Sequence, residues 1–160
     1  MIIHSEQEML DFGKQFARNL SNQTIITKEL PRQSDKEQGD SNSQPVQPTA
    51  IVIELIGDVG TGKTTFTRGL ALGLGIKEPV TSPSFTISKQ YALPNAGRLI
   101  HYDFYRLPDP GLMSEDLAEN LQNPKNIIVI EWGESVTSLL PKDHHTIKIA
   151  YTDNGREVTV

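Results

Sequence analysis

Two apolar runs rich in isoleucine and valine, at residues 50–56 and 127–131, dominate the hydrophobic pattern of the chain. Each has the length of a strand, and its nearly continuous apolar character is typical of a strand covered on both faces. Glu54 interrupts the first run, and the second ends in Glu131. Such strands predict a parallel sheet packed between helices.

Apolar residues recur at helical spacing in further segments. The first segment begins after Ser5 and Glu8, which have the spacing of a capping box at a helix start. The second follows a glycine-rich turn, and Gly75 is expected to end it. The helices predicted from this spacing cover residues 6–20, 66–74 and 112–121.

Alternating apolar and polar residues predict two hairpins. Residues 84–91 and 98–105 form the first, and residues 145–151 and 156–160 the second. The order of strands and helices predicts one α/β domain over residues 1–160. We expect a three-layer fold with a mostly parallel central sheet and antiparallel hairpins.

Residues 31–49 differ in composition from the rest of the chain. They are rich in glutamine, serine, proline and charge, and Val46 is their one apolar residue. Such a segment buries too little apolar surface to offset the entropy lost on ordering. It is therefore predicted to be a mobile insertion within the domain.

Charge and cysteine content exclude several classes of protein. The net charge of −5 disfavours general nucleic-acid binding, which depends on Lys and Arg neutralising phosphates, so any RNA link should run through a partner. The chain has no cysteine for disulfides or thiolate metal sites. No window approaches the roughly 18 apolar residues of a membrane span, and no signal peptide is visible. These features predict a cytoplasmic protein.

The sequence GDVGTGKT at residues 57–64 matches the phosphate-binding loop G-x-x-x-x-G-K-[ST]. Glycines let the backbone approach phosphate oxygens, and successive N–H groups form an anion-binding concavity at a helix start. Lys63 adds a positive charge, and the Thr64 hydroxyl is an oxygen ligand suited to Mg²⁺. The residues expected to hold the nucleotide are Asp58, Val59, Gly60, Thr61, Gly62, Lys63, Thr64 and Thr65. The motif narrows the fold class to a P-loop NTPase-like fold.

Two acids are candidates to complete this site. Glu131 ends an aliphatic strand, as the second acid of a P-loop site does, and ligands bind at the carboxyl ends of parallel strands. Asp103 lies in the first hairpin, where spacing fits a catalytic acid and an ordinary polar residue equally. His101 is expected to be structural or a neighbour of Asp103. Trp132 follows Glu131 and could pack near the nucleotide.

Other polar residues have two readings each. Ser82, Ser84 and Thr86 lie where P-loop switches sense the terminal phosphate, or they belong to a polar hairpin strand. Arg106 fits a surface arginine better than a catalytic one.

ATP is favoured over GTP because no guanine-reading Asn/Thr-Lys-x-Asp motif follows the loop.

The combination of GDVGTGKTTFTRGLALGLG, TSPSFT, HYDFYRL and IIVIEWGE resembles the TsaE (formerly YjeE) family, the small ATPases of bacterial tRNA threonylcarbamoyladenosine synthesis. The resemblance covers most of residues 1–18 and 50–141. It implies slow ATP hydrolysis, and action with TsaD and TsaB, which transfer the threonylcarbamoyl group to an adenosine beside the anticodon.

The resemblance also implies roles for individual residues. Thr64 and Glu131 would hold Mg²⁺, and Asp103 would lie close to the terminal phosphate and support hydrolysis. Trp132 would contact the nucleotide or a partner. Glu6, or its neighbour Ser5, would approach the adenine end. The catalytic set implied is Lys63, Asp103 and Glu131.

Two further functions fit the same motif. A small-molecule kinase could use this fold, although no arginine-rich lid is visible. A nucleotide-sensing module would bind ATP or ADP and a partner without turnover. Analysis of the products of ATP separates these functions, because a kinase leaves the phosphate on a metabolite.

Overall fold

The structure is a computed structural model. It describes residues 1–29, 49–83, 85–107 and 109–160, with no side-chain detail for residues 22–29. The insertion predicted at residues 31–49 lies almost entirely outside the described residues, as does Ser84.

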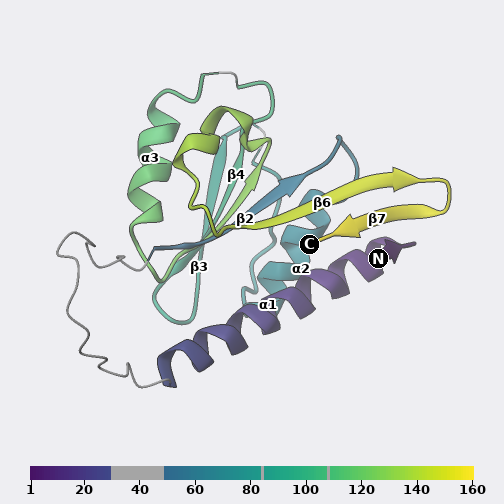
Figure 1. The fold of residues 1–160 in the computed structure, drawn as a ribbon, viewed down its shortest axis with the longest axis horizontal. Helices are drawn as coiled ribbons and strands as arrows, with labels where there is room; N and C mark the ends of the chain where they lie inside the picture. Colours follow the sequence, from purple (N-terminus) through teal and green to yellow (C-terminus); the bar gives the residue numbers. More distant parts are fainter. Residues whose placement is uncertain (30–48, 84, 108) are drawn as a thin grey trace, which may run out of the picture.

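One seven-stranded sheet forms the centre of the described chain (Figure 1). The strands are β1 Ile2–Ile3, β2 Ile51–Ile56, β3 Ser88–Ala92, β4 Arg98–Asp103, β5 Ile127–Glu131, β6 His145–Thr152 and β7 Gly155–Thr159. They lie in the order β1-β7-β6-β2-β5-β4-β3. Strands β6, β2, β5 and β4 run parallel, whereas β1, β7 and β3 are antiparallel to their neighbours. The predicted sheet with two hairpins is confirmed.

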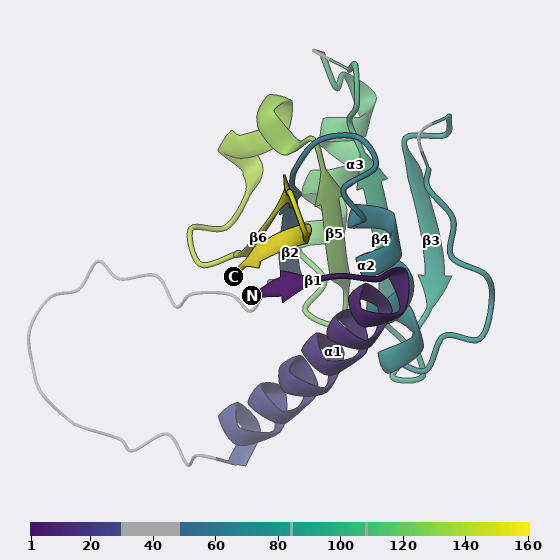
Figure 2. The same cartoon turned by 90° about the vertical axis from the view of Figure 1, so that its right-hand side faces the viewer.

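Helices cover both faces of this sheet (Figures 1 and 2). The helices are α1 Glu6–Glu29, α2 Lys63–Gly73, α3 Leu112–Leu121 and the 3₁₀ helix η1 Gly133–Leu139. Alternate strand residues pack to opposite sides: Leu99 and Val129 join the core under α1 and α2, whereas Ile100 and Ile130 join the core under α3 and η1. The predicted three layers are therefore confirmed.

Helix α1 is longer than predicted. It begins as expected, because the Glu8 N–H donates to Ser5 Oγ at 3.1 Å, and the Glu8 carboxylate accepts from the His4 N–H at 2.8 Å. It continues to Glu29 instead of ending at Leu20. The apolar repeat stops at Leu20, but no glycine or proline follows before Pro31, so nothing in the sequence ends the helix there.

Three glycines bring α1 and α2 into direct backbone contact. A Cβ atom on Gly69 would lie 2.2 Å from the Leu10 carbonyl oxygen, and one on Gly13 would lie 2.4 Å from that of Phe66. A Cβ atom on Gly73 would also meet α1, at the Lys14 carbonyl oxygen, 2.8 Å away. The two helices can pack at this distance only without side chains at these positions.

Replacing Gly69 with alanine should therefore destabilise the fold by about 3 kcal/mol, because the added methyl group must push the two helices apart. Urea unfolding of the purified variant measures the change. The control is Leu72→Ala, on the exposed side of the same helix, which should change the stability by less than about 1 kcal/mol. Equal stability of native protein and Gly69→Ala would show that the close helix contact is wrong.

The structure explains the acid that interrupts β2. Glu54 Oε2 lies 3.2 Å from His144 Nε2, and Glu54 Oε1 lies 3.0 Å from the place where a Cβ of Gly133 would be. The neighbouring His145 packs its ring against Phe16 on the other face of the sheet. Glu54 therefore links β2 to the loop before β6, and its carboxylate leaves no room for a side chain at Gly133.

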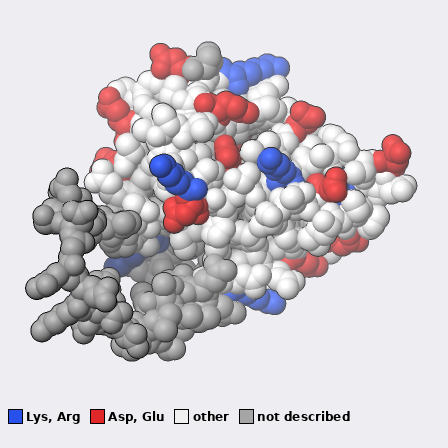
Figure 3. All heavy atoms as spheres, in the orientation of Figure 1, with Lys and Arg blue, Asp and Glu red and all other residues white. Residues whose placement is uncertain are grey.

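The surface shows no concentration of one charge on the face drawn in Figure 3, where Lys and Arg lie among Asp and Glu. Among the residues that the structure describes, none of the helices combines the length and apolar character that crossing a membrane requires.

Candidate functional site

The carboxyl ends of β2, β5 and β4 bring the motif and both acids together. Leu55 of β2 lies opposite Glu131 of β5, and Glu131 lies opposite Asp103 of β4. The phosphate-binding motif follows β2 directly and leads into α2, seen in Figure 2 as a blue arch above that helix. Parallel neighbours thus place the loop and the two carboxylates at one edge of the sheet.

The loop itself has a backbone that glycine favours. Gly60 and Gly62 adopt φ values of 80° and 108°. A Cβ on Gly60 would lie 2.7 Å from the hydroxyl oxygen of Tyr151, which in turn donates to the Val59 carbonyl at 3.3 Å. Helix α2 begins at Lys63, and the first N–H groups of a helix have no acceptor within it, so they are available to an anion.

Thr61 and Asp58 shape this loop from within. The Thr61 side chain is buried, and its hydroxyl donates to the Asp58 carbonyl at 2.9 Å.

Sequence reasoning did not identify Tyr151 as a neighbour of the loop, because the β6–β7 hairpin meets the loop only through the tertiary fold.

Lys63 lies under the loop and is only 4% exposed. Its ammonium group donates to the carbonyl oxygens of Gly57, at 2.7 Å, and Asp58, at 3.0 Å. Glu131 Oε2 lies 3.9 Å from the same nitrogen. Burial lowers the pKa of Lys63, while the negative charges of Glu131 and Asp103 oppose that shift.

Glu131 is the centre of a buried polar cluster. Its Oε1 accepts a hydrogen bond from the Thr64 hydroxyl at 3.3 Å and lies 2.9 Å from His101 Nε2. His101 was expected to be structural or a neighbour of Asp103, and the structure adds that the hydrogen-bond partner of its ring is Glu131. Both side chains point from adjacent strands toward the α2 face, and the strand order brings them together.

Asp103 is held at the same edge. Its Oδ1 accepts a hydrogen bond from the Tyr105 N–H at 3.0 Å, and its Oδ2 accepts one from the Ser82 hydroxyl at 3.3 Å. The carboxylate is 5% exposed and lines the cavity beside the loop. Of the two readings of Asp103, this position favours a functional acid.

Trp132 closes one side of the site in an unusual backbone conformation, with a φ of 58°. Its ring lies 4.6 Å from the Lys63 ammonium and 4.9 Å from the Tyr105 ring. The guanidinium group of the exposed Arg106 lies over the Tyr105 ring, 4.8 Å from its centroid. A strained residue at a site of this kind is a feature of ligand-binding positions.

The cavity at this edge has a volume of about 630 Å³. Its lining consists of Val59, Gly60, Gly62, Lys63, Thr64, Thr65, Ser82, Phe85, Asp103, Tyr105, Arg106, Glu131 and Trp132. Glu6 is not part of this lining. It lies at the start of α1, with its carboxylate 3.6 Å from Arg68.

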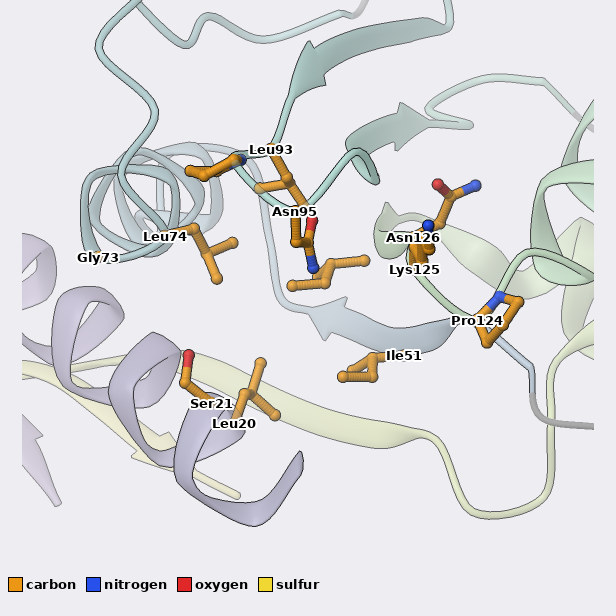
Figure 4. A pocket seen from close by; sticks show the side chains of 12 residues that line it. Leu20, Ser21, Ile51, Gly73, Leu74, Leu93, Asn95, Pro124, Lys125 and Asn126 are labelled. Carbon is orange, nitrogen blue, oxygen red and sulfur yellow. The ribbon is translucent and has the colours of Figure 1, made fainter. Parts of the chain in front are cut away.

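A second cavity, of about 370 Å³, lies away from this site (Figure 4). Leu20 of α1, Leu74 after α2 and Ile51 of β2 point into it, beside the turn before β5. Among the described residues around it, Lys125 is the one ionisable side chain. Its apolar lining does not suit a triphosphate.

The residues at the first cavity fit Mg²⁺ with a nucleotide. Within the described ranges there is no group of three or more His, Cys, Asp or Glu side chains placed to bind a metal alone. Magnesium does not need one, because it is bound by one or two protein oxygens together with phosphates and water. The Thr64 hydroxyl and the Glu131 carboxylate, 3.3 Å apart, are such a pair.

Comparison with known proteins identifies the family of the chain. The sequence matches the family described as threonylcarbamoyl adenosine biosynthesis protein TsaE over residues 3–158. The tRNA threonylcarbamoyladenosine biosynthesis protein TsaE of Haemophilus influenzae is 34% identical over 157 residues, which are 98% of this chain and 84% of that protein. The protein of the same name from Bacillus subtilis is 42% identical over 113 residues, which are 68% of this chain and 67% of that protein.

A solved structure shows the same fold. The crystal structure of Bacillus subtilis YdiB superposes with a TM-score of 0.65 at 27% identity, covering 99% of this chain and 80% of that one. Because the family match spans nearly the whole chain and includes the phosphate-binding motif, this chain belongs to the TsaE family of tRNA threonylcarbamoyladenosine biosynthesis proteins.

Proposed function

We propose that this chain binds ATP with Mg²⁺ at residues 58–65 and hydrolyses the ATP, as the ATPase subunit that acts with TsaD and TsaB in tRNA threonylcarbamoyladenosine modification. The observation that carries the proposal is the convergence of Lys63, Thr64, Asp103 and Glu131 on one cavity at the start of α2. The TsaE family membership supplies the pathway.

The loop binds the triphosphate through main-chain N–H groups and Lys63. The Lys63 ammonium now donates to two loop carbonyls, and it exchanges them for terminal phosphate oxygens when ATP enters. Its charge then stabilises the negative charge that develops during phosphoryl transfer. Thr64 and Glu131 would hold a magnesium ion, which would neutralise phosphate charge.

Asp103 orients the attacking water at the terminal phosphate. The Tyr105 N–H and the Ser82 hydroxyl each hold one oxygen of its carboxylate, so the carboxylate has a fixed direction toward the cavity. The water oxygen attacks the terminal phosphorus, the bond to the ADP oxygen breaks, and ADP and inorganic phosphate leave.

The tRNA is reached through the partner proteins. The net charge is −5, and basic side chains on the visible face are interspersed with acidic ones (Figure 3). Binding of tRNA by this chain alone would need a cluster of Lys and Arg to neutralise phosphates. TsaD and TsaB are therefore the expected contacts of this subunit, inside the cytoplasm.

Phosphate release from ATP, with and without purified TsaD and TsaB, tests this function. We expect slow release by the chain alone and faster release in the presence of both partners. Transfer of labelled phosphate to a metabolite would identify a kinase instead. Nucleotide-dependent partner binding with no hydrolysis under any condition would identify a sensing module.

A further inference from the structure

His101 is fully buried beside Glu131, and the proposed reaction assigns it no role. Its side chain has no exposed surface, and its Nε2 lies 2.9 Å from Glu131 Oε1. Its second ring nitrogen, Nδ1, is buried and has no hydrogen-bond partner among the described residues. A buried polar atom without a partner costs free energy, so an apolar side chain would serve packing better at this position.

The contact with Glu131 indicates which ring nitrogen of His101 carries hydrogen. An ionised carboxylate only accepts hydrogen bonds, so Nε2 must carry the hydrogen that it shares with Glu131. The short contact between these two atoms therefore places a hydrogen on Nε2, directed at the Glu131 carboxylate.

Among the described residues, Glu131 has Lys63, Thr64 and His101 as polar neighbours. The first two take other partners in the proposed nucleotide complex. Lys63 lies 3.9 Å from Oε2, and the Thr64 hydroxyl lies 3.3 Å from Oε1. In the proposed function the ammonium turns to the phosphates and the hydroxyl to magnesium. His101 lies behind the carboxylate, on the neighbouring strand, and remains hydrogen-bonded to it.

We propose that His101 is a positioning residue, which holds Oε1 of Glu131 so that the carboxylate presents a fixed direction to magnesium. The proposal rests on the proposed function, because it assigns a role within that metal site. Groups that hydrogen-bond to a metal-binding side chain orient it, and their loss commonly lowers metal affinity or activity by about 10- to 100-fold.

Two substitutions separate positioning from packing. His101→Leu replaces the ring with an apolar side chain of similar size that cannot donate a hydrogen bond. His101→Gln keeps an N–H group at a similar distance from the backbone. We expect His101→Leu to raise the Mg²⁺ concentration that gives half-maximal ATP hydrolysis by about 10-fold or more. His101→Gln should restore most of the native Mg²⁺ dependence.

Nucleotide affinity without metal is the second readout. With EDTA present, ATP should bind the native protein and both variants with affinities within about twofold, because the loop and Lys63 are unchanged. An unchanged Mg²⁺ dependence in His101→Leu would overturn the proposal. So would an equal loss of ATP affinity with and without metal, which would indicate general disruption of the site.

The native protein provides a test that needs no variant. Nitrogen-15 NMR of the histidine rings distinguishes hydrogen on Nε2 from hydrogen on Nδ1. We expect His101 to carry hydrogen on Nε2, both before and after addition of Mg²⁺ and ADP. A ring with hydrogen on Nδ1 and none on Nε2 would overturn the proposal even if His101→Leu did not fold. Failure of the native chain to bind any nucleotide would instead overturn the proposed function itself.

Discussion

Replacing Lys63 with alanine is expected to lower the rate of ATP hydrolysis by about 100- to 1,000-fold, the loss that follows removal of one group stabilising the transition-state charge. The Lys63 ammonium lies beneath the loop, and at 4% exposure it is largely shielded from bulk water. Electrostatic stabilisation is strongest at such a site, because little water screens it. Phosphate release in the presence of TsaD and TsaB measures the rate.

The matched control for this variant is Lys125→Ala. Lys125 is exposed and lies beside the second cavity, away from the loop, so its removal changes the net charge equally and should leave the rate unchanged. Thermal unfolding of both variants shows whether they fold. A folded Lys63→Ala protein with native turnover would contradict the role of this lysine.

Replacing Glu131 with glutamine should also lower hydrolysis by about 100-fold or more, but with a different effect on binding. The amide is a poorer magnesium ligand than the carboxylate, so activity should fall at every Mg²⁺ concentration. Without metal, ATP affinity should be kept or increased, because a negative charge that repels the triphosphate has been removed. Isothermal titration with and without EDTA gives the two affinities.

Glu134→Gln is the control for this second variant. Glu134 lies in η1, three residues beyond Glu131, and its side chain is exposed. Its substitution removes the same charge near the site and should leave the rate of hydrolysis and the Mg²⁺ dependence close to native. Native turnover by Glu131→Gln, or a rate lowered equally by Glu134→Gln, would show that Glu131 has no special role at the metal.

The loop and its acids could be predicted because they depend on local sequence. A glycine-rich segment between an apolar strand and a helix needs no distant contact to be recognised, and β2, the loop and α2 lie as predicted. The position of Glu131 could be predicted because it ends an apolar strand, and such strands run parallel to the strand before the loop. The position of one strand end relative to another then follows from the sheet.

The partner of His101 could not be predicted in the same way. Alternation along β4 places His101 and Asp103 on one face, which fits His101 either as a structural residue or as a neighbour of Asp103. The actual partner comes from β5, whose Val129 lies opposite His101. The order of strands depends on the whole sheet. The alternation of residues along one strand does not show which strand lies beside it.

The contact between α1 and α2 also could not be predicted from the local sequence pattern. Gly13 and Gly69 look like ordinary helix residues with low helix propensity in the sequence. Their role is visible only in the packed structure, where each glycine faces a carbonyl oxygen of the other helix and leaves room for the close contact. Residues that matter through a distant neighbour are therefore the ones that sequence reasoning misses in this chain.

Equilibrium dialysis of the purified chain against radiolabelled ATP and Mg²⁺ tests the central claim most directly, since it measures binding to the loop amides and Lys63 without requiring turnover or partners. The structure predicts saturable binding of one ATP per chain that unlabelled ADP competes away and Lys63→Ala abolishes. No binding at millimolar ATP, or equal binding by Lys63→Ala, would contradict it.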